Sequence, residues 1–127
     1  MTRPGADKGQ ATVEFVLALP VLMLFLLAVV QVGLVVRDQI SVIHAAREGA
    51  RAASVDDTGG PGGAAAAGVA RAGGLDPARR EVATSVHDGL ATVTVSYRAP
   101  TDVPIIGPLL PDRTVTASVT MALEPTS

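Results

Sequence analysis

The chain has 127 residues, a formal net charge of −2 and no Cys, so it can form one domain with an appendage but no disulfide framework or thiolate site. Its two His residues are too few for a three-histidine metal site, and the near-neutral charge argues against a nucleic-acid surface, which needs a basic patch. We therefore expect no metal, no cofactor and no nucleic-acid partner. The hydrophobic fraction of 48% is unevenly distributed along the chain.

An uncharged apolar segment covers residues 15–36, where only Pro20, Gln31 and Gly33 fall outside the apolar set. At about 1.5 Å per residue a helix of this length spans roughly 33 Å, which matches the hydrocarbon core of a bilayer. A buried core helix is one alternative, but residues 37–127 hold only 21 large apolar residues to cover it. A cleaved secretory signal is another, but no A-x-A-like site follows closely. We predict a membrane-spanning helix.

The two flanks of this helix carry nearly equal numbers of Lys and Arg, so these counts do not decide its orientation. The leader carries Arg3 and Lys8, whereas Arg37, Arg47 and Arg51 follow the apolar segment. A short N-terminus before a long domain rich in Thr and Ser favours a single-pass membrane protein with a cytoplasmic N-terminus and an extracytoplasmic C-terminal domain.

A short polar motif stands directly before the apolar segment. Lys8 and Gly9 are followed, five residues after the Gly, by Glu14. This arrangement resembles the type IV prepilin signal, in which a membrane prepilin peptidase cuts after the Gly and leaves the apolar helix in the product. The resemblance implies a leader of residues 1–9 and a mature chain that starts at Gln10. Gly suits an extended backbone in a protease cleft and disfavours helix up to the cut.

Glu14 lies in the first turns of the expected helix, where the helix dipole favours a negative charge. A carboxylate near hydrocarbon nonetheless needs a partner. The resemblance supplies one, the positive N-terminus of a neighbouring subunit in assembled pilins. The alternative is that Glu14 only marks the headgroup boundary. Pro20, which removes the hydrogen bond to the carbonyl of Val16, should bend or loosen the helix.

The resemblance extends beyond the leader and covers residues 10–55. One run is similar to the hallmark of TadE-like proteins: Ala45, Ala46, Arg47, Glu48, Gly49, Ala50 and Arg51. TadE-like proteins are pseudopilins or minor pilins of the tight-adherence (Flp) type IV pilus system. The resemblance implies four partners: a prepilin peptidase, other Tad/Flp pilins, the membrane assembly platform and the lipid bilayer.

The hallmark run also predicts a two-faced helix. Small residues recur at helical spacing on one face: Val42, Ala46, Gly49, Ala50 and Ala53. Glu48 lies on the opposite face, at pairing distance from His44 and Arg51. The small face allows another backbone to approach, and we favour the protein's own sheet over a partner helix. His44 beside Glu48 has no nucleophile or third ligand nearby, so it does not indicate a catalytic site.

The rest of the chain predicts a small outer domain. The long helix of residues 10–55 should run from about Ala11 to about Ser54. Residues 56–80 form a Gly/Ala-rich flexible link with a short helix around 64–72, which Gly73 and Gly74 close.

Residues 81–127 alternate apolar and hydroxyl side chains, with a tight hairpin turn at Asp88–Gly89 and a third strand over residues 115–123. Ile105, Ile106, Leu109 and Leu110 are too apolar for a free loop. Together these elements predict an α+β, pilin-like fold, in which the long helix packs on a small antiparallel sheet of about three strands.

We predict from these features a structural, non-catalytic protein, a TadE-like minor pilin or pseudopilin of the Flp pilus. The alternative is an unprocessed, single-pass, signal-anchored envelope protein that binds a partner protein through its sheet. An enzyme with a small-molecule substrate is not supported, because no catalytic constellation is present and the domain is too small for a deep pocket.

Overall fold

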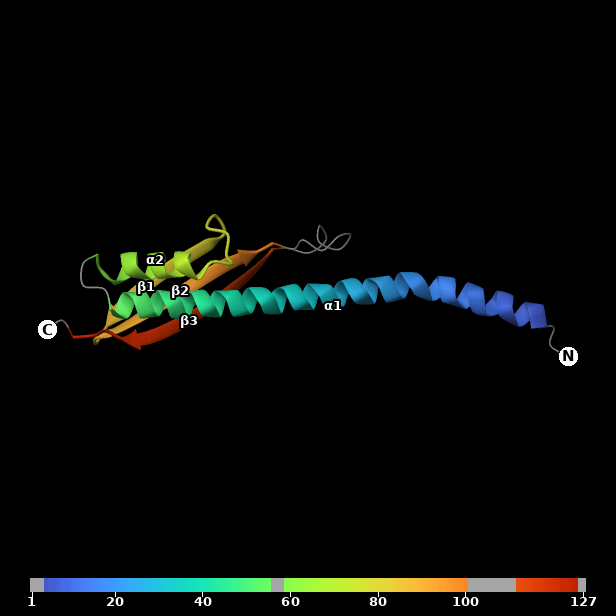
Figure 1. Ribbon diagram of the computed structural model, residues 1–127, viewed down its shortest axis with the longest axis horizontal. Coiled ribbons are helices and arrows are strands. Elements are labelled where there is room, and N and C mark those ends of the chain that lie inside the picture. Colours follow the sequence, from blue (N-terminus) through green and yellow to red (C-terminus); the bar gives the residue numbers. More distant parts are fainter. Residues whose placement is uncertain (1–3, 56–58, 101–111, 126–127) are drawn as a thin grey trace.

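The computed structural model describes residues 4–55, 59–100 and 112–125. Its elements are α1 (Pro4–Ser54), α2 (Pro61–Ala72), β1 (Arg80–His87), β2 (Leu90–Ala99) and β3 (Arg113–Ala122). Figure 1 shows α1 as one long rod, with α2 and the sheet gathered around its C-terminal part and the N-terminal part projecting alone. The predicted α+β fold, a long helix on a three-stranded antiparallel sheet, is confirmed.

Helix α1 has 51 residues, which corresponds to about 76 Å of length at about 1.5 Å per residue. It continues without a break through Pro20 and curves gently in its N-terminal third (Figure 1). It ends at Ser54, as predicted, where the carbonyl oxygen of Ser54 accepts a hydrogen bond of 2.9 Å from the backbone N–H of Glu124. The chain that leaves β3 therefore fixes the C-terminal end of the helix.

The start of α1 differs from the prediction. The sequence places it near Ala11, but the helix begins at Pro4 and passes through Gly9. A single Gly inside a helix costs only about 1 kcal/mol relative to Ala, and adding residues to a helix that already exists is far cheaper than nucleating one. The hydroxyl of Thr12 also donates a hydrogen bond of 2.9 Å to the carbonyl oxygen of Lys8.

Helix α2 corrects the expectation of a flexible link. The short helix exists, begins earlier than predicted, at Pro61, and is closed as predicted by Gly73 and Gly74, which have φ of 68° and 77°. The helix is not part of a flexible link, however, because it packs alongside α1 (Figure 1). Its face of Ala65, Gly68 and Val69 is buried, because small side chains allow its backbone to lie directly against α1.

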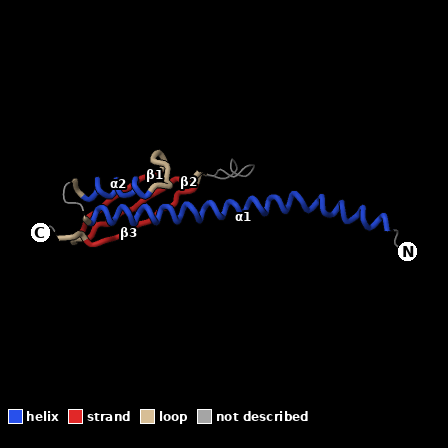
Figure 2. Tube along the Cα trace, in the orientation of Figure 1, coloured by secondary structure: helices blue, strands red, loops and turns tan. Residues whose placement is uncertain are grey.

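The sheet has the order β1-β2-β3, with both pairs antiparallel. Asp88 and Gly89 have φ of 50° and 74° and form the predicted two-residue hairpin turn between β1 and β2. Figure 2 shows the strands alongside the two helices. The inner residues of β2 are buried: Ala91, Val93, Val95, Tyr97 and Ala99. Ile105, Ile106, Leu109 and Leu110 lie outside the described residues.

The outer face of the sheet carries a ladder of hydroxyl groups. Thr92 Oγ1 and Thr120 Oγ1 are 2.8 Å apart, and Thr94 Oγ1 and Ser118 Oγ are 2.7 Å apart. These partners are directly opposite in the register of β2 and β3. Cross-strand pairs of this kind each contribute a few tenths of a kcal/mol up to about 1 kcal/mol, so the outer face is stabilised by polar contacts.

The core is made mostly of small side chains from α1, α2, β2 and β3, and Val82 of β1 is partly buried against it. Its largest fully buried side chains are Val42, Val69, Val93 and Val95. Five of the fourteen buried apolar residues belong to α1: Val42, Ala45, Ala46, Ala50 and Ala53. The outer domain thus completes its core with the second half of the long helix.

Gly68 provides a direct test of this packing. A Cβ atom at Gly68 would lie 2.6 Å from the carbonyl oxygen of Glu48 and 2.9 Å from Cβ of Ala52. We expect Gly68→Ala to lower the free energy of unfolding by about 1–3 kcal/mol, because backbone must move to admit the methyl group. Tyr97, the only Tyr of the chain and 7% exposed, reports unfolding by its fluorescence in detergent solution.

Gly63→Ala is the matched control in the same helix, since a Cβ atom there meets nothing within 4 Å. It should raise stability by up to about 1 kcal/mol, through helix propensity. Equal effects of the two substitutions would contradict the proposed close approach of α1 and α2.

Candidate functional site

The N-terminal half of α1 is apolar and bare. Most large apolar side chains between Val13 and Val36 are 43–69% exposed, Leu27, Leu34 and Val35 are partly exposed, and an 18-residue window with a mean hydropathy of 2.8 has no buried residue. Transfer of such half-exposed side chains out of water is worth about 1 kcal/mol each. For more than a dozen of them the sum rivals the whole stability of a typical domain, about 5–15 kcal/mol. α1 is long and apolar enough to cross a membrane.

The predicted processing residues lie at the exposed start of this segment. Gly9, Gln10 and Glu14 are all exposed on α1, and a Cβ atom at Gly9 would meet nothing within 4 Å. Glu14 follows Gln10 by one helical turn, about 6 Å along the axis, so both lie on one face. Within the described residues Glu14 takes part in no ion pair. Its carboxylate is therefore free to meet a cation from outside the chain.

The hallmark run is split between core and surface. Ala46, Gly49 and Ala50 are buried, whereas Arg47 and Arg51 are exposed. A Cβ atom at Gly49 would meet Val69 Cγ2 at 2.9 Å, Val93 Cγ1 at 3.1 Å and the carbonyl oxygen of Ala65 at 3.2 Å. The preference for packing on the protein's own sheet is confirmed, and α2 shares this contact.

The expected ion pairs of Glu48 are wrong. In the described part of the chain Glu48 pairs with neither His44 nor Arg51, and it is partly buried. The reason is α2, which covers the side of α1 that the sequence assigned to solvent. Gly68 lies against the carbonyl of Glu48, and Gly74 lies against Ser41, whose Oγ is 3.7 Å from the position of a Cβ atom.

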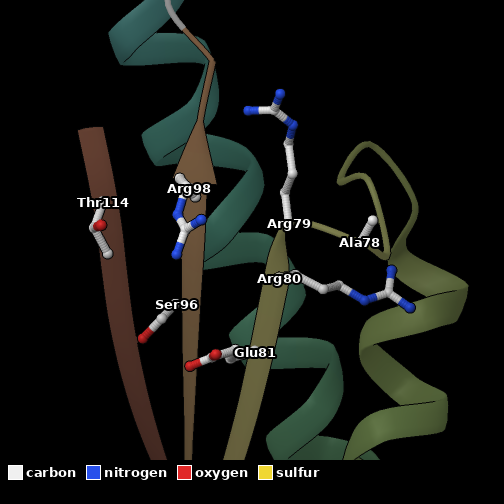
Figure 3. A pocket seen from close by; sticks show the side chains of 7 residues that line it. All are labelled: Ala78, Arg79, Arg80, Glu81, Ser96, Arg98 and Thr114. Carbon is white, nitrogen blue, oxygen red and sulfur yellow. The ribbon is translucent and has the colours of Figure 1, made fainter. Parts of the chain in front are cut away.

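Sequence reasoning missed a group of arginines at one end of the sheet. Arg79, Arg80 and Arg98 line a shallow cavity of about 200 Å³ (Figure 3). The guanidinium group of Arg79 lies 3.6 Å from the carboxylate of Asp112. The backbone carbonyl oxygen of Arg79 accepts a hydrogen bond from the backbone N–H of Arg98. The sequence did contain a signal for this group. The turn at Asp88–Gly89 sets the register of the hairpin, and that register places Arg79 opposite Arg98.

The chemistry that these features offer is binding and packing. Over residues 4–55, 59–100 and 112–125 no three His, Asp or Glu side chains lie close enough to hold a metal ion. The exposed apolar helix, the free carboxylate of Glu14 and the small-residue core of the outer domain are each suited to contacts with lipid or with other protein subunits.

These features define a class of protein, an α+β domain built on the end of one long helix that is able to span a membrane. Residues 9–51 match the family model described as TadE-like protein. The TadE-like resemblance, with its hallmark run, is thereby confirmed, and the match supports involvement in the Tad pilus system. It covers about a third of the chain and ends before α2 and the sheet. Comparison with curated proteins and with solved structures gives no match.

The two halves of the hallmark run should respond differently to substitution. We expect Gly49→Ala to lower the free energy of unfolding by about 1–3 kcal/mol, since the methyl group would press on Val69 and Val93. Arg47→Gln should change it by less than about 0.5 kcal/mol, because Arg47 is exposed. Unfolding of the full chain in detergent, followed by Tyr97 fluorescence, measures both. A large loss from Arg47→Gln would contradict this division of roles.

Proposed function

We propose that this protein is a structural, non-catalytic minor pilin or pseudopilin that takes part in assembly of Flp/Tad type IV pili. The observation that carries the proposal is the coincidence of three features within residues 9–51. They are the TadE-like family match, an apolar helix with no protein cover, and an exposed Gly9–Gln10 bond at its start. Its partners are then a prepilin peptidase, other Tad/Flp pilins, the membrane assembly platform and the lipid bilayer.

In this proposal α1 holds the protein in the membrane, with the N-terminus in the cytoplasm and the outer domain outside. The peptidase removes residues 1–9 and leaves Gln10 as the new N-terminus. The exposure of Gly9 and the lack of tertiary contacts around it support access by a protease. Because the leader is helical, the peptidase must unwind its last turn before cleavage.

During assembly the bare face of α1 exchanges lipid for the helices of neighbouring subunits. Glu14 then pairs with the terminal amine of an adjacent subunit, which compensates for the cost of a carboxylate near hydrocarbon. The exposure of Glu14 and its lack of an ion pair within the described residues support this role. The outer domain stays outside the helix bundle and offers its sheet edges and hydroxyl face for lateral contacts.

The second candidate is an unprocessed, single-pass, signal-anchored envelope protein that binds a partner protein through its sheet. The flat hydroxyl face of β2 and β3 favours this function, since it is exposed and uncovered by either helix. The two candidates differ in one covalent property, the position of the N-terminus.

The N-terminus of the membrane-extracted protein tests the cleavage directly. After co-expression with a prepilin peptidase we expect a chain that starts at Gln10, and without the peptidase one that starts at Met1. Gly9→Ala should reduce cleavage at least tenfold, because the added methyl group blocks the cleft while α1 itself tolerates it. Gly33→Ala, at a Gly in α1 that also has nothing within 4 Å, should be cleaved normally. A start at Met1 with the peptidase present would favour the second candidate.

The role of Glu14 is tested by incorporation into pili. We expect Glu14→Ala to be cleaved normally but to enter sheared pilus fractions or the assembly complex at least tenfold less well. The reason is the loss of the charge pair in a low-dielectric environment. Glu14→Asp, which keeps the charge, should retain part of the incorporation. Normal incorporation of Glu14→Ala would remove Glu14 from the assembly mechanism.

A further inference from the structure

One end of the sheet lies close to the apolar segment of α1. The loop between α2 and β1 meets α1 at Ser41, whose Oγ is 3.7 Å from the position of a Cβ atom at Gly74. Ser41 follows Val36 by five residues, which is about 7.5 Å along the helix. The polar headgroup layer on each side of a bilayer is about 5–8 Å thick. When the apolar segment is in hydrocarbon, this loop therefore lies at headgroup depth.

Arginine side chains gather at this same end of the sheet. Arg79 and Arg80 lie where β1 begins and Arg98 lies near the end of β2 (Figure 3). Arg113, the first residue of β3, pairs in register with Ala99 beside them. Figure 1 shows that this end of the sheet points toward the bare part of α1. In Figure 3 the side chain of Arg79 extends beyond the start of β1, that of Arg98 lies over β2 and that of Arg80 points toward α2. Four arginines thus lie at the end of the sheet that faces the bare part of α1.

The acidic groups nearby do not neutralise this end. Asp112 is 3.6 Å from Arg79, with both side chains more than a third exposed, and Glu81 lines the same cavity. Arg80 and Arg98 make no ion pair with any described residue. Figure 3 shows the guanidinium groups of Arg80 and Arg98 apart from each other, so each can pair with an anion from outside the chain. Neighbouring like charges repel one another, so such anions stabilise this end of the sheet.

The geometry points to a binding site for the phosphate group of an anionic phospholipid, in the leaflet that faces the outer domain. Guanidinium groups bind phosphate oxygens through pairs of parallel hydrogen bonds. The hydroxyl groups of Ser96 and Thr114 line the same cavity of about 200 Å³ as further donors. The inference rests on the membrane span of the proposed function, but it requires neither cleavage nor pilus assembly.

A labelled full-length chain in lipid nanodiscs tests this site. The chain contains no Cys, so Ala78→Cys places one environment-sensitive fluorophore at the exposed rim of the cavity. We expect its emission to respond as phosphatidylglycerol replaces phosphatidylcholine, with a saturable dependence on the mole fraction. The same label at Ala66→Cys, on the exposed face of α2, should not respond.

Paired substitutions separate the cavity from net charge. One Arg near an anionic membrane surface contributes about fivefold to association, and two contribute about 30-fold. We expect Arg80→Gln with Arg98→Gln to raise the mole fraction of phosphatidylglycerol needed for half-saturation about 30-fold. The fluorescence response then disappears at every mole fraction that a nanodisc can hold. Arg47→Gln with Arg51→Gln removes the same charge from exposed positions of α1 outside the cavity and farther from the apolar segment, and should leave the response unchanged.

Three results would overturn the inference. They are no response to phosphatidylglycerol, an unchanged response in the Arg80/Arg98 variant, and an equal response to inorganic phosphate added to phosphatidylcholine nanodiscs at constant ionic strength. The last would assign the cavity to a soluble anion. Failure of the chain to enter nanodiscs would overturn the proposed function as well, whereas insertion without a response overturns only the lipid site.

Discussion

The close approach of α1 and α2 is the constraint on which the outer domain depends. Gly68 has no side chain, and its Cα lies so near the carbonyl of Glu48 that no larger residue fits without displacement of backbone. Gly49 gives the same freedom on the other side of the contact, where Val69 of α2 and Val93 of β2 converge. Because the two helix backbones are in direct contact, little volume remains between them, and side chains as small as Ala and Val can fill the core.

Helix α1 serves two environments with one continuous backbone. From residue 42 onward it buries small residues against its own domain, and before residue 37 most of its large apolar residues are exposed. The family match over residues 9–51 covers both parts of this helix and ends before α2 and the sheet. One helix thus combines a segment long and apolar enough to cross a membrane with part of the core of the outer domain.

The features that sequence reasoning predicted correctly depend on local rules. The Asp88–Gly89 turn requires positive φ, the alternation in β2 follows the pleat, and the Gly-rich stretch beyond Ser54 ends the long helix. The features that sequence reasoning missed depend on contact with another element of the same chain. Ala65 and Gly68 look like linker composition until a second backbone lies against them. The sequence analysis did not predict the helical leader, because it gave the small helix-breaking cost of Gly9 more weight than the ease of extending a long helix that already exists.

The outer domain packs on α1 mainly from about Ser41 onward, so in the processed chain that we propose residues 10–40 form a rod of about 45 Å. A rod held at one end acts as a lever. A rotation of the outer domain by about 12° would carry the far end sideways by about 10 Å, which is close to the diameter of a helix. In the assembly that we propose, small rotations of the outer domains would be magnified into changes of neighbour at the far ends of the helices. The angle at which outer domains meet would then determine which helices can pack together.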